Sequence, residues 1–291
     1  MRVDPADEAQ DEVDEAEEQA VEATTKAGFG QPSKRELDLV AKMADLAERT
    51  RRLPDARVRY LVDWIRKELC PDLPKLGEPV KTAAGWNPKR VVIFTEYADT
   101  KRYLEQQLRA AIGATERGEE RLATFYGGMG KREVQVDGVR DLREEIKRAF
   151  NADPDKHPLR ILVATDAARE GVNLQNHCAD LFHMDLPWNP SRLEQRNGRI
   201  DRKLQRAPEV RCHYFVYKQR PTDRVTEVLA ERTMVIHEEL GSMPPVLEER
   251  VTRRLAGGIA PKARQQLVDA LKNETADVRT AGAPGELEGV R

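Results

Sequence analysis

Strand-like apolar runs alternate with helical stretches through the middle of this 291-residue chain, and this alternation constrains the possible folds more than any other feature. The apolar runs lie at 91–95, 122–126, 161–165, 180–186 and 210–217. Helical spacing of apolar residues marks the stretches 100–111, a long one within 131–150, and 191–202. Strands that alternate with helices build βαβ units around a parallel sheet. We therefore predict an α/β fold in which helices flank a parallel sheet.

The flanking sequence differs from this alternating region. Residues 1–32 are acidic and hold few large apolar side chains, which predicts disorder. Ser33 and Glu36 have the S-x-x-E spacing of a capping box, and apolar residues follow at helical spacing. Helical extensions are therefore predicted at both ends. The predicted segments are an acidic disordered lead (1–32), a helical extension and linker (33–85), the sheet domain (86–220), C-terminal helices (221–258) and a partly disordered tail (259–291).

The net charge of −2 conceals two regions of opposite charge. Residues 1–22 hold ten carboxylates, whereas residues 191–220 hold nine lysines and arginines against three acidic residues. The balanced total therefore does not identify a partner, but the local basic region suits a polyanion.

The three cysteines, Cys70, Cys178 and Cys212, have no spacing typical of a disulfide framework. His177 next to Cys178 lacks a second pair at ligand spacing, so we predict ordinary packing and no metal site. No apolar run reaches membrane-spanning length, and the N-terminus is acidic where a signal peptide is basic. We therefore predict a cytoplasmic protein with no membrane contact.

The motif QRNGRIDR, which begins at Gln195, places several arginines close together. Ser191 and Glu194 form another S-x-x-E capping box, which predicts a helix from Ser191 to Arg202. On such a helix Gln195, Arg199 and Arg202 (i, i+4, i+7) share one face. Two guanidinium groups on one face suit the terminal phosphate of a nucleotide, because guanidinium binds phosphate bidentately and stays charged. The alternative is a basic helix that is solvated, salt-bridged or bound to nucleic acid.

A second motif, ATDAAREGVNLQ, overlaps the carboxyl end of the run at 161–165. Ligands of parallel α/β sheets bind at the carboxyl ends of the strands, so this position is informative. Together with DLPWNPSRLEQRNGRIDR, the motif resembles motifs V and VI of superfamily 2 helicases and translocases, most closely the Swi/Snf-like bacterial branch. VVIFTEYADT resembles motif IV, and ATFYGGMGKRE resembles the loop that follows it. The resemblance covers residues 91–202 and implies a RecA-like, C-terminal motor domain.

The resemblance also implies roles for individual residues. Arg199 and Arg202 match the arginines that face the γ-phosphate, and Gln195 matches the glutamine beside them. The positions near the nucleotide ribose and the hinge with the partner domain are Glu170, Gly171 and Asn173. The positions that touch the nucleic-acid backbone through hydroxyl and main-chain N–H groups are Thr95, Gly127, Gly128 and Thr165. For this last group, a strand-end cap at Thr165 and a plain turn at Gly127-Gly128 fit the sequence equally well.

A helicase motor also needs a phosphate-binding loop, G-x-x-x-x-G-K-[ST], and an acidic pair that holds Mg²⁺. This loop is not found among the 291 residues, and the acidic run from Asp14 to Glu17 has no hydrophobic strand before it. The resemblance therefore implies that ATP with Mg²⁺ is bound mainly by a first RecA-like domain, in cis in the full protein or in trans. We predict that this chain does not hydrolyse ATP alone and that its nucleic acid is DNA rather than RNA. The alternative is a non-enzymatic module, derived from a helicase domain, that binds nucleic acid or a protein.

Overall fold

The computed structural model describes most of the region between residues 33 and 220. The described residues are 33–51, 53–79, 84–126, 132–135, 138–140, 142–165, 173–187 and 190–220, with the single positions 223, 227, 228 and 231. The predicted disordered lead, most of the predicted C-terminal helices and the predicted tail lie outside these residues.

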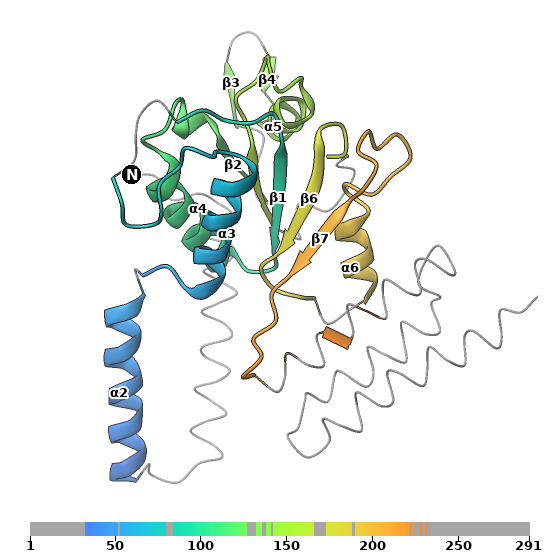
Figure 1. Ribbon diagram of the computed structural model, residues 1–291. Helices are drawn as coiled ribbons and strands as arrows, with labels where there is room; N and C mark the ends of the chain where they lie inside the picture. Colours follow the sequence, from blue (N-terminus) through green and yellow to red (C-terminus); the bar gives the residue numbers. More distant parts are fainter. Residues whose placement is uncertain are drawn as a thin grey trace, which may run out of the picture. The chain divides into compact units, whose positions relative to one another are not determined.

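Five strands form one sheet in the order β2–β5–β1–β6–β7 (Figure 1). They are β1 (Arg90–Thr95), β2 (Leu122–Phe125), β5 (Ile161–Thr165), β6 (Cys178–His183) and β7 (Arg211–Tyr214). The pairs β2–β5, β1–β6 and β6–β7 are parallel. All residues of β1 and β5 are buried, as expected for apolar strands of a parallel sheet that is covered on both faces. The predicted α/β fold with a parallel sheet and flanking helices is confirmed.

The described α-helices are α2 (Lys34–Thr50), α3 (Ala56–Glu68), α4 (Ala98–Ile112), α5 (Leu142–Asn151) and α6 (Pro190–Asn197), with a short 3₁₀ turn at Gly118–Glu120. The capping box predicted at the start of α2 is confirmed. The backbone N–H of Ser33 donates to the Glu36 carboxylate (2.7 Å), and the Glu36 N–H donates to the Ser33 hydroxyl (3.3 Å). Local sequence therefore determines where this helix begins.

The chain divides into two compact units. Unit 1 comprises residues 1–89 and 97–168, and unit 2 comprises residues 90–96 and 169–291. Helices α2 to α5 belong to unit 1, whereas β1, β6, β7 and α6 belong to unit 2.

In unit 1, α3 packs against α4. Leu61 of α3 and Leu104 of α4 are fully buried. The Tyr103 hydroxyl of α4 accepts a hydrogen bond from the Asp55 N–H (2.8 Å) and donates one to the Leu53 carbonyl (3.0 Å). A polar contact therefore fixes the chain entering α3 to the side of α4.

The region predicted as a long helix within 131–150 is helical only in its second half. Two short antiparallel strands, β3 (Arg132–Gln135) and β4 (Gly138–Arg140), precede α5. The sequence REVQVDGVR contains alternating valines and an Asp-Gly pair, both of which favour a hairpin over a helix. The predicted helix within 131–150 is therefore confirmed from Leu142 onward, whereas the described residues before it form a hairpin.

Candidate nucleotide-facing site

Helix α6 carries the first part of the QRNGRIDR motif and lies beside β6 and β7 in unit 2 (Figure 1). Its first residue is Pro190, a position where the missing N–H and the fixed φ of proline suit a helix. Ser191 lies inside the first turn of α6 rather than before it. The helix therefore begins one residue earlier than predicted, and the side-chain bonds of the predicted capping box at Ser191 lie outside the described residues.

The helix predicted over 191–202 ends at Asn197. Beyond it, the N–H groups of Arg199 and Ile200 bond to carbonyls three residues back, at 3.0 and 3.1 Å, and the Asp201 N–H bonds four residues back to the Asn197 carbonyl (2.9 Å). Asn197 and Gly198 both have low helix propensity, which accounts for an end at this point. The last residues of the motif therefore form tight turns.

The prediction that Gln195, Arg199 and Arg202 share one helix face is wrong for the same reason. Only Gln195 belongs to α6, where it is exposed. The carbonyl of Arg199 accepts a hydrogen bond from the N–H of Leu174 (3.0 Å), a residue of the ATDAAREGVNLQ motif. This bond joins the turn after α6 to that motif.

Arg196, the first arginine of the motif, is buried (1% exposed). Its guanidinium donates from Nη1 to the carbonyl of Asp185 (2.9 Å) and from Nη2 to Asp185 Oδ1 (3.2 Å), and lies 5.8 Å from the ring centroid of Phe94. The Asp185 carboxylate also accepts from Thr95 Oγ1 (2.5 Å) and from the Glu96 N–H (2.9 Å). A buried cation is thereby paired with a carboxylate that is itself well hydrogen-bonded, as burial requires.

A second, more exposed ion pair lies beside this one. Arg192 Nη1 of α6 is 2.6 Å from Glu96 Oε1, which follows β1. Both side chains are partly exposed, so the pair contributes little stability by itself. Together, the two pairs attach α6 to the carboxyl ends of β1 and β6.

The last residue of α6 is also held by buried groups. His183 Nε2 lies 2.9 Å from Asn197 Oδ1, and Asn197 Nδ2 donates to the Tyr214 hydroxyl (3.1 Å). Burial, together with the nearby Arg196 cation, lowers the pKa of His183 to about 3. The ring is therefore neutral near pH 7, and its Nε2 must carry the proton that bonds to Asn197.

The turn after α6 brings two of the predicted site residues into contact. Arg202 donates from Nη1 to Asn173 Oδ1, and from Nε to the Gly198 carbonyl (2.6 Å). Arg202 and Asn173 are both exposed, and Arg199 is half-exposed. Guanidinium and amide groups on an exposed turn are groups that can bond to phosphate and hydroxyl oxygens.

Two residues predicted to touch nucleic acid lie at strand ends, and the rest of the predicted set is only partly described. Thr95 ends β1 and Thr165 ends β5, and both are buried. Because the Thr95 hydroxyl donates to Asp185, it must leave this carboxylate before it can bond to a phosphate. The four positions Gly127, Gly128, Glu170 and Gly171 lie outside the described residues. The predicted nucleic-acid contacts stay predictions.

Sequence reasoning missed Asp185 and Arg196. Leu193 and Ile200 are buried. Arg196 lies three residues after Leu193 and four residues before Ile200. This spacing places Arg196 on the inward face of a helix, where a charged residue needs a partner. The signal for that partner was the aspartate directly after the apolar run DLFHM.

The described residues show neither a metal centre nor a membrane span. They contain no group of three or more His, Cys, Asp or Glu side chains that could hold a metal ion. The described helices are all too short or too polar to cross a membrane.

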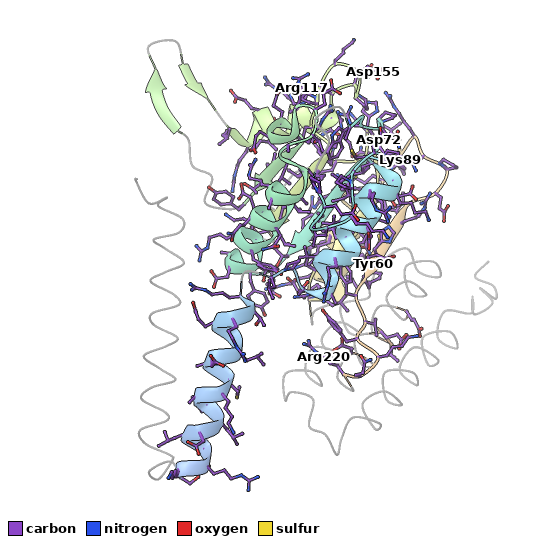
Figure 2. The ribbon with its side chains drawn as sticks, turned by 60° about the vertical axis from the view of Figure 1, so that its left-hand side comes forward. Tyr60, Asp72, Lys89, Arg117, Asp155 and Arg220 are labelled. Atoms are coloured by element: carbon purple, nitrogen blue, oxygen red, sulfur yellow. The ribbon has the colours of Figure 1, made fainter. Side chains whose placement is uncertain are left out.

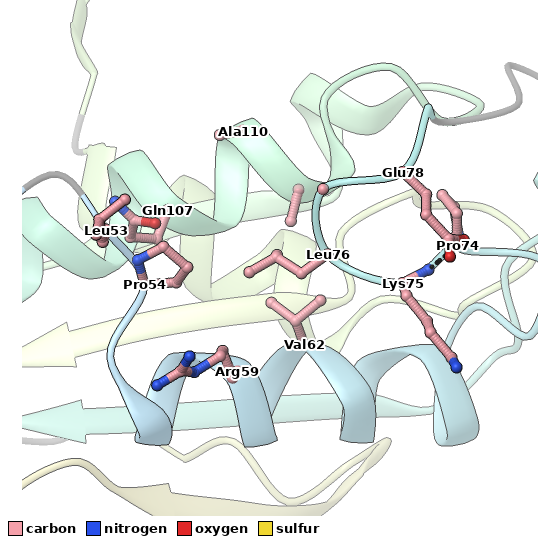
Figure 3. Close-up of a pocket in the computed structure, with 12 residues that line it drawn as sticks. Leu53, Pro54, Arg59, Val62, Pro74, Lys75, Leu76, Glu78, Gln107 and Ala110 are labelled. Carbon is pink, nitrogen blue, oxygen red and sulfur yellow. Dashed lines mark hydrogen bonds between the residues drawn. The ribbon is translucent and has the colours of Figure 1, made fainter.

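A separate hollow of about 520 Å³ lies within unit 1, between α3, α4 and the loop at 74–78 (Figure 3). Its lining is formed by Leu53, Pro54, Arg59, Val62, Pro74, Lys75, Leu76, Gly77, Glu78, Gln107, Ala110 and Ala111. Most of these are apolar or small, and none belongs to the motifs that carry the candidate site. The hollow is therefore not part of that site.

Comparison with known proteins gives a family for the middle of the chain. Residues 83–203 match the helicase conserved C-terminal domain. The chain is 31% identical over 159 residues to "Uncharacterized ATP-dependent helicase YqhH" of Bacillus subtilis (strain 168), which covers 54% of this chain and 24% of that protein. It is 31% identical over 148 residues to RNA polymerase-associated protein RapA of Vibrio parahaemolyticus, which covers 51% of this chain and 12% of that protein. The alignments thus span about a quarter or less of these relatives.

Among solved structures, the crystal structure of the C-terminal part of the Fun30 ATPase domain aligns with 64% of this chain and 48% of that chain. The sequence identity is 19% and the TM-score is 0.37.

Proposed function

We propose that this chain is the second motor domain of an ATP-dependent DNA helicase or translocase of superfamily 2, because residues 83–203 match the helicase conserved C-terminal domain and its relatives include an ATP-dependent helicase. In this proposal Arg199 and Arg202 are arginine fingers, and Gln195 lies beside them. The observation that supports it most is the contact of Arg202 with Asn173, because it joins the two motifs expected to face the nucleotide. The motor is completed by a first RecA-like domain that carries the phosphate-binding loop.

The surroundings of Arg202 suit a finger. The Asn173 amide and the Gly198 carbonyl are neutral, so they orient the guanidinium without cancelling its charge. A guanidinium stays protonated at any physiological pH. A positive charge held in this way stabilises the negative charge that develops on a transferring phosphoryl group, an effect worth about 10³–10⁵ in rate.

The fingers also need a rigid base. The buried pair of Arg196 and Asp185 fixes α6 at the strand ends, and the turn that carries Arg199 and Arg202 follows directly. In this proposal the first domain binds ATP with Mg²⁺. Glu170, Gly171 and Asn173 approach the nucleotide from this chain.

The proposed nucleic-acid track uses backbone contacts from the strand ends and their loops. Its residues are Thr95, Gly127, Gly128 and Thr165. Such contacts hold register without reading sequence. DNA is the proposed substrate because the motif sequences contain no pattern that is typical of 2′-hydroxyl recognition.

The test combines this chain with a purified first RecA-like domain that carries the phosphate-binding loop, and measures phosphate release with and without duplex DNA. We expect no turnover from either half alone and DNA-stimulated turnover from the mixture. Arg202→Ala should lower that turnover by about 10³ or more. Arg206→Ala, an exposed arginine from the same basic segment, is the matched control and should leave it unchanged. Turnover by this chain alone that is sensitive to Arg202→Ala contradicts the proposal.

The non-enzymatic alternative gives a different result in the same assay. A module that only binds nucleic acid or a protein yields no DNA-stimulated turnover in the mixture. Its nucleic-acid affinity then falls to a similar extent in Arg202→Ala and Arg206→Ala, because both substitutions remove one exposed positive charge.

A further inference from the structure

Helix α2 presents an apolar face that no described residue covers. None of its 17 residues is buried, and Figure 2 shows side chains projecting on both sides of the helix. Leu39, Val40, Met43 and Leu46 are 51–68% exposed. An isolated helix of fewer than ~12–15 residues is marginal in water, and a 17-residue helix is only slightly longer. A helix with such a face normally packs it against another element.

The face has a heptad spacing and one basic edge. Leu39, Met43 and Leu46 follow each other at intervals of four and three, the spacing of a coiled-coil seam. Arg35, Lys42 and Arg49 recur every seven residues and therefore run along one side of that seam. In an antiparallel pair of two α2 helices these basic edges would face each other and repel. A second copy in antiparallel orientation is therefore a poor occupant.

The first 23 residues of the chain carry the complementary pattern. Small apolar residues recur at alternating intervals of three and four at Ala6, Ala9, Val13, Ala16, Ala20 and Ala23. The same stretch is strongly acidic, with ten carboxylates in residues 1–22. Small residues on one helix leave room for large residues on its partner, and acidic flanks suit a basic edge.

We propose that residues 6–23 dock along the apolar face of α2 as an antiparallel helix of the same chain. The connection at 24–33 includes Gly28, Gly30 and Pro32, residue types that allow the chain to reverse. The segment of 18 residues spans about 27 Å as a helix, close to the length of α2. Docking supplies the apolar burial that the acidic segment lacks by itself.

The heptad spacing gives a specific register. Ala16 lies opposite Met43, Ala20 opposite Leu39, and Val13 opposite Leu46. In this register Glu12 and Arg49 occupy facing positions beside the seam, where opposite charges select the partner. The proposal does not depend on the motor function, so either can fail without the other.

The test introduces cysteines at two positions that the register brings together. The full chain with Ala16→Cys and Met43→Cys is oxidised mildly with oxidised glutathione, and the product is examined on a non-reducing gel and by mass. Burial raises the pKa of Cys70 to about 11 and the pKa values of Cys178 and Cys212 to about 12, so the native thiols react little. We expect an intramolecular disulfide in most of the protein.

The matched control pairs Ala16→Cys with Glu48→Cys, which lies on the polar side of α2. It should form at least several-fold less intramolecular disulfide. Equal yields from both pairs, or no disulfide in either, would overturn the proposal. A disulfide that links two chains would overturn it in favour of a second copy.

A charge-reversal pair tests the register independently of packing. Arg49→Glu should reduce the yield of the Ala16–Met43 disulfide, and adding Glu12→Arg to the same chain should restore it. Circular dichroism before oxidation checks that α2 remains helical in each variant. Loss without recovery in the double variant, with helicity retained, contradicts the proposed pairing of Glu12 and Arg49.

Discussion

Arg196 and Arg202 lie six positions apart in one motif and have opposite surroundings. Arg196 belongs to a buried anchor, which we define as Arg196, Asp185, Thr95, His183 and Asn197. Arg202 belongs to an exposed turn, which we define as Arg199, Arg202 and Asn173. In the anchor a guanidinium bonds to a carboxylate, whereas in the turn it bonds to neutral oxygens.

Solvation explains this difference. A guanidinium removed from water needs a carboxylate nearby, because an unpaired buried charge is very costly. A guanidinium that is to bind an incoming anion needs the opposite, since a bound carboxylate would compete with that anion. One short motif can therefore hold a helix in place with one arginine and present another to a ligand.

The largest expected effect on folding comes from breaking the anchor. Arg196→Ala leaves the Asp185 carboxylate, which is 19% exposed, without its cation and should lower the free energy of unfolding by about 3 kcal/mol. Arg202→Ala should change it by less than about 0.5 kcal/mol. Urea unfolding of the two variants measures the contrast. Equal decreases in the free energy of unfolding in the two variants would show that Arg196 and Arg202 do not differ in their contribution to stability.

Acid should weaken the anchor and not the turn. His183 has a pKa of about 3 in the folded chain, against about 6.5 in an unfolded chain. Between these values only the unfolded state binds the proton, so stability is complete above pH 6.5 and falls as the pH is lowered. The loss between pH 6 and pH 4 should reach about 2 kcal/mol in urea unfolding.

His183→Gln should make that pH dependence shallower by the slope of one proton. If the free energy of unfolding depends on pH equally steeply in His183→Gln and in the parent chain, His183 does not contribute to the anchor as proposed.

A smaller effect should separate the two roles of Thr95. Thr95→Val removes the hydroxyl that donates to Asp185 and should lower the free energy of unfolding by about 1.5 kcal/mol, while Thr95→Ser should keep most of it. Unfolding and DNA affinity are measured on both variants. If Thr95→Val weakens DNA binding and leaves stability unchanged, the hydroxyl belongs to the nucleic-acid track and not to the anchor.

The sequence predicted the features that depend on local pattern. Buried parallel strands read as continuous apolar runs, and the capping box at Ser33 depends on residues three apart, so both were found in advance. The resemblance to superfamily 2 helicases rested on contiguous motifs and is confirmed. The role assigned to each site residue stays a prediction.

The features that were missed depend on contacts between distant residues. The end of α6 is set in part by the bond between Leu174 and Arg199, which are 25 positions apart, and helical spacing cannot reveal such a bond. The anchor needs Asp185 and Arg196 from different elements, so neither residue identifies the pair by itself. The local spacing of residues therefore predicted that a helix exists at α6, but not the residue at which it ends.

The hydrogen bonds of the Tyr103 hydroxyl have a consequence for where this domain can be truncated. The family match begins at residue 83, but the Tyr103 hydroxyl is held by Leu53 and Asp55, thirty residues earlier. A fragment that starts at residue 83 would keep every recognisable motif, lose α3 and uncover the side of α4 that α3 packs against. The segment that matches the family is thus shorter than the packed structure around α4, which includes α3 and the residues from Leu53 that bond to Tyr103.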